Sequence, residues 1–176
     1  MFYIKITMNI VEADYRISKN DKFIIESSIS VSLWDENLIN NFHENLNNIL
    51  NEIYVKSNST FSNSKKLISL CFAGDKKIKE LNKSYRKINL ATNVLSFPCY
   101  SNSKNEFFLG NIIFSIETIC REAKRDNKSV NNHLIHLFVH GVLHLLGYDH
   151  ETEKEAKKME NLEIQILETL QINNPY

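Results

Sequence analysis

The chain has 176 residues, of which 43% are apolar and 24% charged, as in an ordinary globular protein. A chain of this length most economically makes one domain with its own hydrophobic core, which we place at residues 21–176 behind an N-terminal extension over residues 1–20. Lysine plus arginine (21) balances aspartate plus glutamate (21), so the net charge is zero with histidine neutral. This excludes attraction of a nucleic acid by the overall charge, and any nucleic-acid partner must be held by a local basic patch.

Three features of the sequence bear on the cellular location: its apolar stretches, its N-terminal residues and its cysteines. No stretch is long and apolar enough to span a bilayer. Glu12 and Asp14 stand where a signal peptide has its apolar segment, which disfavours secretion. Cys71, Cys99 and Cys120 form no CxxC pair, so neither a disulfide framework nor a cysteine-based zinc site is indicated. We therefore expect a cytoplasmic protein whose thiols are reduced and structural.

The predicted elements alternate along the chain without an internal repeat. Runs rich in β-branched and apolar residues predict strands at 23–33, 65–73, 93–99 and 107–116. Helical spacing of apolar residues, with Asp35 and Asp75 as caps of the first two helices, predicts helices at 35–55, 75–86, 117–127, 130–146 and 151–170. This mixture favours a layered α+β or α/β fold over a helix bundle.

Two residues within the predicted strands carry a local meaning. Pro98 ends the third strand, which suits a sheet edge or a strand terminus, because proline cannot donate to a neighbouring strand. Gly110 lies inside the fourth strand, where a glycine often marks a bulge or the close approach of another backbone or a ligand.

The stretch "HLFVHGVLHLLGYDH" (136–150) holds the strongest functional signal. His140 and His144 are one helical turn apart, so both imidazoles can reach one metal ion. Gly147, three residues later, can adopt the left-handed conformation that ends the helix and turns the chain back. His150 then returns to the same face. Three histidine ligands leave one zinc position open, as a catalytic site requires.

Single histidines on apolar helices are usually core residues, but three at these offsets with a stop glycine indicate a metal site. His133 and His136 precede the three ligands on the same helix and have no place among them. We expect them to support the ligands from behind or to lie at the surface, and His136 is an outside candidate for a general base. His43, in the first predicted helix, is expected to be exposed.

The spacing also matches the metzincin protease pattern H-E-x-x-H-x-x-G-x-x-H at every histidine and at the glycine. Gly141 stands where those proteases have the glutamate that acts as general base. Glycine has no side chain to accept a proton, so peptide hydrolysis by that route is disfavoured. A metal at this site could still lower the pKa of water and polarise a phosphoryl oxygen.

Four stretches together resemble the YbeY family, the zinc-dependent endoribonucleases of ribosomal RNA maturation. "HGVLHLLGYDH" (140–150) resembles the family signature, and "LNKSYRKINLATNVLSFP" (81–98) resembles its second motif. "LGNIIFS" (109–115) is similar to its L-G-D-[IL]-x-[IV] strand, and "EKEAKKMENLEIQIL" (153–167) to its acidic last helix. The resemblance runs from about residue 67 to the end of the chain.

The resemblance implies an α+β fold, with a small mixed sheet of about four strands, about five helices and a zincin-like helix that binds metal. It implies that His140, His144 and His150 hold one zinc ion per chain. The functionally important arginine of the family falls on Arg86, whose planar fork suits a phosphate, although a cation complementing a helix C-terminus explains it equally well from spacing alone.

Other positions of the second and third motifs are weaker candidates. Thr92, Asn93 and Ser96 could line the cleft and bind substrate, and a turn followed by an ordinary strand explains them nearly as well. Asn111 stands where the family usually has aspartate, which keeps the shape of the side chain and loses its charge. Asp149, between the glycine and the third ligand, is expected to cap the next helix.

The function implied is a single-strand-specific, metal-dependent endoribonuclease of ribosomal RNA maturation and ribosome quality control. Its expected partners are ribosomal RNA or its precursors, with ribosomal proteins or a ribosome-associated GTPase as further candidates, and no membrane. Two alternatives stay open: a non-catalytic, zinc-containing ribosome assembly factor, and a metallohydrolase acting on a non-RNA substrate. The open metal position argues against the assembly factor, and Gly141 argues against the hydrolase with a non-RNA substrate.

Unpaired RNA suits such a cleft, because splayed bases can stack on aromatic side chains while the backbone reaches the metal. Tyr85, Phe97 and Tyr100 are the aromatic candidates, with core packing the simpler role for Phe97. The basic stretches "REAKRDNK" (121–128) and "SKK" (64–66) are candidate phosphate-binding patches, and each is explained more simply as a solvated face.

Overall fold

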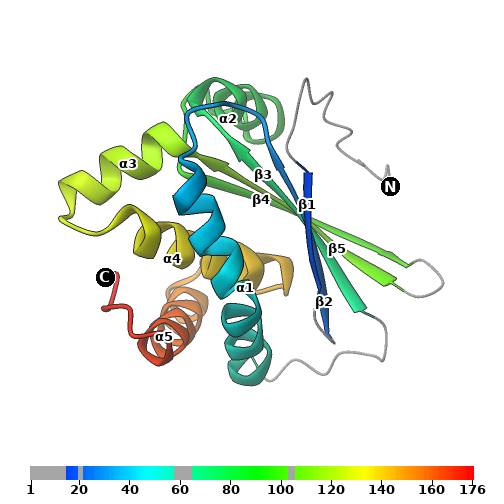
Figure 1. Cartoon of the computed structure of the whole chain (residues 1–176). Helices are drawn as coiled ribbons and strands as arrows, with labels where there is room; N and C mark the ends of the chain where they lie inside the picture. The colour runs from blue at the N-terminus through cyan, green and yellow to red at the C-terminus, as the bar shows by residue number, and fades with distance from the viewer. Residues whose placement is uncertain (1–14, 20–21, 58–64, 103–105) are drawn as a thin grey trace.

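The computed structural model describes residues 15–19, 22–57, 65–102 and 106–176, which form one sheet and the helices around it (Figure 1). The strands are β1 (Tyr15–Lys19), β2 (Phe23–Ile29), β3 (Lys65–Ala73), β4 (Val94–Asn102) and β5 (Glu106–Ser115). The helices are α1 (Glu36–Lys56), α2 (Asp75–Leu81), the π-helical turn η1 (Asn82–Arg86), α3 (Ile116–Arg125), α4 (Val130–Leu145) and α5 (Glu153–Thr169). Within these ranges no helix combines the length and apolar character needed to cross a membrane.

The sheet is mixed, with strand order β1-β2-β3-β5-β4. β2, β3 and β5 run parallel, and β1 and β4 pair antiparallel at the two edges. The predicted α+β fold with a mixed sheet is confirmed, but the sheet has five strands where about four were expected. The additional strand is β1, which lies within the stretch predicted to be an N-terminal extension. The first 14 residues lie outside the described ranges, so the boundaries of the extension and of the domain stay predictions.

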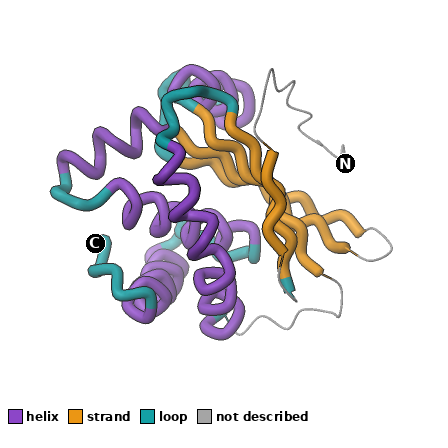
Figure 2. Tube along the Cα trace, in the orientation of Figure 1, coloured by secondary structure: helices purple, strands orange, loops and turns teal. Residues whose placement is uncertain are grey.

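Alternating side chains of the central strands build two cores of unequal size. Ile68, Leu70 and Phe72 of β3 enter the larger core, which contains residues of α1, α3, α4 and α5. Cys71 and Ala73 point to the other face, where they pack with residues of α2. Successive side chains of a strand point to opposite faces of the sheet, so a strand that is buried on both faces contributes to both cores. The helices are therefore unevenly distributed, with most of them gathered against one face of the sheet (Figure 2).

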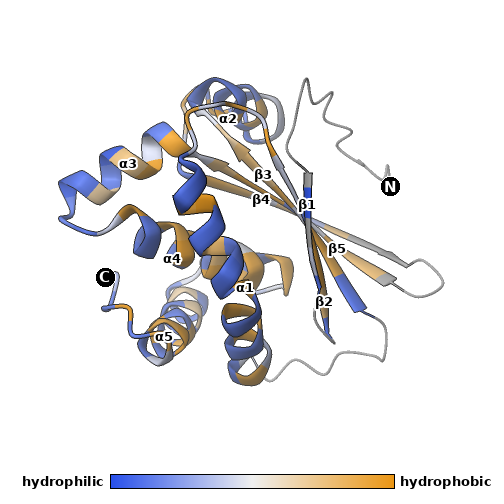
Figure 3. Cartoon of the chain, viewed as in Figure 1, coloured by the Kyte–Doolittle hydropathy of each residue, from blue (hydrophilic) through white to orange (hydrophobic). Residues whose placement is uncertain are grey.

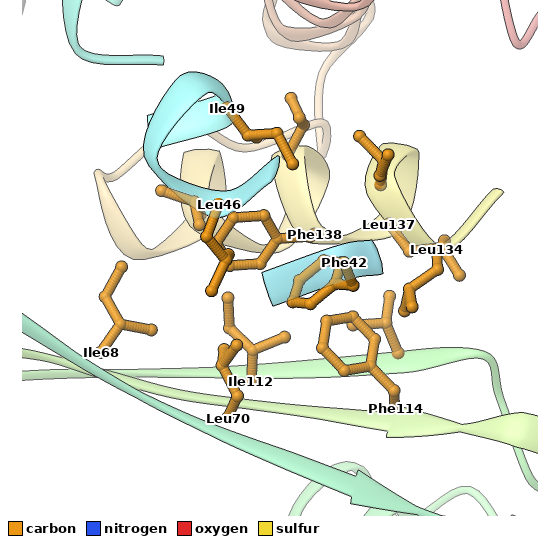
Figure 4. Packing of buried hydrophobic residues seen from close by; sticks show 14 of the residues in the cluster. Phe42, Leu46, Ile49, Ile68, Leu70, Ile112, Phe114, Leu134, Leu137 and Phe138 are labelled. Atoms are coloured by element: carbon orange, nitrogen blue, oxygen red, sulfur yellow. The ribbon is translucent and has the colours of Figure 1, made fainter. Parts of the chain in front are cut away.

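Helix α1 shows how the sequence pattern is used in packing. The carboxylate of Asp35 accepts a hydrogen bond from the backbone N–H of Leu38 at 2.9 Å, which confirms the predicted cap. Its apolar face turns inward and its polar face outward (Figure 3). Phe42 of α1 packs edge-on against Phe138 of α4, with ring centroids 5.2 Å apart. This contact lies over the middle of the sheet and anchors α4 there (Figure 4).

Gly110 produces both of the features expected of it. Along β5, Phe108 pairs with Leu67 and Gly110 pairs with Ile68, so one residue is bulged out of the ladder. The φ angle of Gly110 is 144°, and a Cβ built there would lie 2.2 Å from the carbonyl oxygen of Phe97. Only glycine allows this approach. A Cβ on Gly110 would also lie 2.9 Å from Leu145 Cδ2, so the end of α4 packs closely on β5 at this residue.

His43 is partly buried between α1 and the sheet edge, contrary to the expectation that it is exposed. Its ring nitrogens lie 3.2 Å from the hydroxyl of Ser18 and 3.1 Å from that of Ser27. Burial, aided by the positive charge of Arg16, lowers the pKa of His43 to about 4. Helical spacing alone did not reveal this burial, because β1, which contributes Ser18 and Arg16 beside His43, was not among the predicted strands.

This depressed pKa predicts a loss of stability in mild acid. Below the unfolded-state value of 6.5, the unfolded chain binds a proton at His43 that the folded chain refuses until about pH 4. We expect the free energy of unfolding of the metal-free protein to fall by roughly 1 kcal/mol at this site between pH 7 and pH 5. Urea unfolding of the native protein and of His43→Gln at both pH values measures it. An equal acid loss in the variant would contradict the assignment.

Candidate metal centre and cleft

Helix α4 presents the histidines of the predicted site. It begins behind Ser129, whose hydroxyl accepts from the backbone N–H of Asn132 at 3.1 Å, and it is apolar around most of its circumference. That composition makes α4 a buried helix, packed between α1, α3, α5 and the sheet. His140 and His144 are only partly buried, because they project from the face of α4 that borders a cleft.

Gly147 ends α4 as predicted and turns the chain toward His150. Its φ angle is 89°, in the left-handed region. The N–H of Gly147 donates to the carbonyl of His144 at 3.0 Å, and the N–H of Tyr148 donates to that of Leu143 at 3.0 Å. These two bonds make a Schellman turn, which satisfies carbonyls left free at the helix end. The hydroxyl of Tyr148 donates to the carbonyl of Ser57 at 3.0 Å and ties this turn to the end of α1.

The turn brings all three predicted ligands together. One ligand atom from each of His140, His144 and His150 lies within 4.8 Å of the other two. The Nε2 atoms of His140 and His144 are 3.1 Å apart. Nitrogens bound 2.0–2.1 Å from a tetrahedral zinc ion are separated by roughly 3.3 Å. The spacing of these atoms therefore fits a shared metal ion.

The hydrogen bonds behind the rings decide which nitrogens are free to bind a metal. The Nδ1 atom of His144 lies 3.1 Å from the carbonyl oxygen of Tyr148, and that of His140 lies 2.9 Å from a carboxylate oxygen of Glu163. Both partners only accept, so each Nδ1 carries the proton and each Nε2 has a bare lone pair. Two bare lone pairs facing each other at this distance repel unless a cation lies between them. This is the arrangement that a metal centre requires.

The protonation state of His144 also suits a ligand. Burial and, to a smaller extent, electrostatic repulsion between a protonated His144 and the imidazoles of His140 and His150 lower the pKa of His144 to about 4. The imidazole is consequently neutral at physiological pH, and neutral imidazole is the form that binds a metal.

Glu163 of α5 is part of this centre, although it was not among the predicted residues. Its side chain is fully buried and accepts from His140, from His136 at 2.9 Å and from the hydroxyl of Tyr176 at 2.7 Å. Burial would raise the pKa of Glu163, but the hydrogen bonds from His136, His140 and Tyr176 outweigh it and hold the pKa at about 2. The sequence did contain a sign of its burial. Glu163 lies one helical turn after the buried Met159, on the apolar face of α5, where a carboxylate is unusual unless it has partners.

The two other histidines of α4 face carboxylates and not the cleft. His136 contacts Glu163 through Nε2, so it touches the same carboxylate as His140. His133 is buried, and its Nε2 lies 2.8 Å from Glu122 of α3. The amide of Asn93 donates to the same oxygen of Glu122 at 2.8 Å. Asn93 is thus held from behind by α3 while it borders the cleft in front.

The cleft beside the histidines has a volume of about 770 Å³. It is lined by residues from three separate parts of the chain: the end of η1, the start of β4, and the end of α4 with the turn that follows. All the predicted cleft residues belong to it, namely Arg86, Thr92, Asn93, Ser96, His140, His144 and His150. The sequence did not indicate that Asp149 and Glu151 also line it.

Arg86 is exposed at the end of η1. Among the described residues, no carboxylate or carbonyl engages its guanidinium, so all five N–H donors are available to a ligand. Of its two explanations, complementing a helix C-terminus is weakened by this geometry, because the cap of η1 is the left-handed Lys87, whose Nζ contacts the carbonyl of Ser84 instead.

Gly141 has a packing role that explains the absence of a glutamate there. A Cβ built on Gly141 would lie 3.0 Å from Ser96 Oγ and 3.0 Å from Ile112 Cδ1. The helix thus rests directly on β4 and β5 at this residue. The position corresponding to the protease glutamate faces the sheet and not the cleft, so this chain has neither the side chain nor the space for that general base.

Several weaker predictions are corrected or limited by the structure. Thr152, and not Asp149, caps α5, in a reciprocal capping box with Glu155. Asp149 instead accepts from the backbone N–H of His150 at 2.8 Å. Asn111 is buried in β5, opposite Phe97, and is not among the residues lining the cleft.

The predicted aromatic and basic groups differ in availability. Tyr85 is 42% exposed and contacts Phe97, with ring centroids 5.1 Å apart. The side chain of Tyr100 lies outside the described part of the structure. In the basic stretch 121–128, three of the four cationic groups are engaged: Arg121 with Asp75, Arg125 with Asp126, and Lys128 with the carbonyl of Pro175.

The second basic stretch, 64–66, is not an exposed patch. Lys66 is buried in β3, with Nζ 4.9 Å from the ring centroid of Phe107, and Ser64 lies outside the described residues. Neither stretch therefore provides a free cationic surface comparable to Arg86.

The fold and the site define a class: an α+β protein in which three histidines, from one helix and the turn after it, can hold a metal ion beside a cleft. Comparison with known proteins gives the family. The sequence model of the family described as "Endoribonuclease YbeY" matches residues 26–171, so the chain belongs to the YbeY family, and the predicted resemblance is confirmed.

Relatives named "Endoribonuclease YbeY" are closely similar to this chain. The protein of Bartonella quintana is 49% identical over 112 residues, covering 62% of this chain and 71% of its own. That of Polynucleobacter asymbioticus is 48% identical over 110 residues, covering 62% and 70%. The solution structure of TM1509 from Thermotoga maritima matches with a TM-score of 0.50 at 22% identity, covering 84% of this chain and 91% of that one, and it supports the fold alone.

Proposed function

We propose that this protein is a metal-dependent endoribonuclease that cleaves unpaired RNA, with ribosomal RNA or its precursors as substrate. It acts in the cytoplasm, in ribosomal RNA maturation and ribosome quality control, with ribosomal proteins or a ribosome-associated GTPase as further partners. Membership of the YbeY family supports the reaction class. The metal is one zinc ion per chain, held by His140, His144 and His150, because three imidazoles with a free position are the ligand set of catalytic zinc.

A single observation carries the proposal. The bare Nε2 atoms of His140 and His144 lie 3.1 Å apart, and His150 lies beside them. These histidines border the same cleft as Arg86, whose guanidinium has no partner among the described residues. A metal ion and a guanidinium that border one cleft are suited to a phosphodiester, whose two non-bridging oxygens share a negative charge.

The residues of this chain have separable roles in the reaction. A zinc ion bound by the histidines supplies Lewis-acid chemistry, polarising a phosphoryl oxygen and lowering the pKa of water. Arg86 binds the scissile or the adjacent phosphate and offsets the charge that develops during cleavage. Thr92 and Asn93 line the same cleft and orient the RNA backbone. Within the described part of the chain, Ser96 Oγ has no hydrogen-bond partner, and it lies against Gly141, which places it deeper in the wall.

Zinc analysis combined with cleavage assays tests the function. The protein, loaded with one equivalent of zinc, is incubated with a single-stranded RNA, the same sequence as a duplex, and a mixed peptide pool. We expect cleavage of the single strand only, with binding that weakens as salt rises, because phosphates are neutralised on binding. Peptide cleavage would indicate a protease. RNA binding without cleavage across zinc, nickel and manganese would indicate a non-catalytic assembly factor.

Arg86→Ala is expected to lower the rate of RNA cleavage by about a hundredfold or more, because it removes a preorganised cation from the transition state. The fold and the zinc content should not change, since the side chain is exposed and does not contact the histidines' partners. Single-turnover cleavage rates measure the effect, and Arg86→Lys should recover only part of it, because an ammonium cannot bind a phosphate bidentately. Arg125→Ala, which removes an exposed arginine that does not line the cleft, is the control and should cleave at the native rate.

A further inference from the structure

The carboxylate of Glu163 is the most heavily engaged acidic group near the proposed metal centre. Its side chain is 0% exposed. Oε1 accepts from His140 Nδ1 at 2.9 Å, and Oε2 accepts from His136 Nε2 at 2.9 Å and from the hydroxyl of Tyr176 at 2.7 Å. An isolated carboxylate is very costly to bury, so its retention at this depth requires these donors.

The contact with His140 has a specific consequence for a metal ligand. By accepting from Nδ1, Glu163 keeps the proton on that nitrogen, orients the ring and leaves Nε2 bare toward the other histidines. A carboxylate behind the ring also makes the imidazole a better electron donor to a cation.

The three ligands differ in this respect. His144 is held by a neutral backbone carbonyl, and the His150 ring has no hydrogen-bond partner among the described residues. Among the described residues, His140 is thus the one ligand whose ring is hydrogen-bonded to a carboxylate.

Tyr176 comes from the segment after α5, which folds back beside α4 (Figure 1). The backbone of this segment is held at two points: the N–H of Ile172 donates to the carbonyl of Leu167 at 2.9 Å, and Lys128 Nζ donates to that of Pro175 at 2.7 Å. The ring of Tyr176 meets that of His136 edge-on, with centroids 5.9 Å apart, while 60% of the residue stays exposed. Only the hydroxyl reaches inward, and it ends on Glu163.

We propose that Glu163 is a positioning residue for the metal centre, held in place by His136 and Tyr176, so that the segment from Ile172 to Tyr176 sets the metal affinity of a site it never touches. The proposal rests on the metal site of the proposed function. It assigns a role to His136 as well. Together with the hydroxyl of Tyr176, its ring fixes the carboxylate that supports His140, and it does not exchange protons with substrate. A simple structural tie between α4 and α5 would stabilise the fold without changing the affinity for a metal.

The test is a zinc affinity measurement by competition with a chromophoric chelator, on native protein, Glu163→Gln and Tyr176→Phe. A glutamine presents one acceptor and an N–H₂ group to three donors, so it cannot serve His140 and the other pair together. We expect Glu163→Gln to weaken zinc binding roughly 10- to 100-fold and Tyr176→Phe roughly threefold to tenfold. Glu168→Gln, the same change at an exposed position of α5, is the matched control and should bind zinc as the native protein does.

A second readout reports on the ring itself. In ¹⁵N-labelled, zinc-loaded native protein, the Nδ1–H of His140 should give a downfield proton resonance, and Glu163→Gln and Tyr176→Phe should shift it. Circular dichroism of the metal-free proteins shows whether each variant folds. Zinc affinity within twofold of native in a folded Glu163→Gln overturns the proposal. If Glu163→Gln does not fold, Tyr176→Phe decides: native affinity with an unmoved His140 resonance overturns it.

The same titrations separate this proposal from the proposed function. If the native protein binds no zinc, or if His140→Ala binds it as tightly as native, the metal centre itself is refuted and both proposals fall together. If the native protein binds zinc and His140→Ala does not, but both variants around Glu163 bind normally, only the positioning role is refuted. RNA cleavage is not needed for any of these outcomes.

Discussion

Replacement of His140 by alanine is expected to abolish stoichiometric zinc binding and to lower the rate of RNA cleavage by about a thousandfold or more. His140 is central to the site, since its Nε2 lies 3.1 Å from that of His144 and its ring stacks on that of His150 at 5.5 Å. Two remaining imidazoles cannot hold the ion in a defined position. The chemistry that a metal supplies is worth several kcal/mol of barrier, and each 1.4 kcal/mol is a tenfold change in rate.

The metal and activity losses must be separated from a loss of fold. His140→Ala leaves Glu163 without one of its three donors, at a cost of roughly 1–3 kcal/mol in the free energy of unfolding. His150→Ala provides the cleaner comparison, because His150 is exposed and its ring holds no buried group in place. We expect the same loss of zinc and cleavage with a native melting temperature for the metal-free protein.

Elemental analysis and single-turnover cleavage measure both effects, with His43→Gln as a control histidine outside the cleft. Cleavage at the native rate by a folded His140→Ala or His150→Ala protein would show that the reaction takes place elsewhere in the molecule.

Introducing the protease glutamate by Gly141→Glu is expected to destabilise the fold by more than about 3 kcal/mol and not to create peptidase activity. A side chain at this position meets Ser96 Oγ and Ile112 Cδ1 at 3.0 Å from its first carbon. Ile112 is fully buried, so it has little room to move. Overpacking alone costs about 1–3 kcal/mol, and a carboxylate directed into the sheet adds the cost of an unpaired buried charge.

Thermal unfolding of the metal-free protein measures this effect, and a loss of this size corresponds to a drop in melting temperature of about 10 °C for a chain of this length. Gly141→Ala is the graded control, because it adds only the Cβ. It should fall between the native protein and Gly141→Glu, although alanine is the better helix former by about 1 kcal/mol. A Gly141→Glu protein that melts at the native temperature would show that α4 does not rest on β4 and β5 at this residue.

The pattern of the chain predicted those parts of the site that depend on residues close together in sequence. One helical turn separates His140 from His144, and Gly147 ends the helix through a left-handed φ of 89°. Both follow from local backbone geometry, which is the same in any fold. The strand at 65–73 was also predicted at its observed bounds, from a short apolar run that is followed by Gly74.

Other features could not be predicted from local pattern, because they depend on what a segment packs against. β1 is short and polar at both ends, and it is a strand only because the edge of β2 is there to pair with it. With β1 unknown, the burial of His43 could not be foreseen. Gly141 was recognised as the position that lacks a base, but the reason for a glycine there is the approach of β4 and β5.

The amino-acid sequence by itself determined the identity and spacing of the three histidines, the turn that returns the third of them, and the family to which these residues point. Only the tertiary structure decided that Arg86 and these histidines border one cleft and that Glu163 and Tyr176, from the end of the chain, lie behind His140. The physical reason is range. Helix periodicity and turn geometry act over a few residues, whereas a buried carboxylate acquires its partners only when α5 and the segment after it pack against α4.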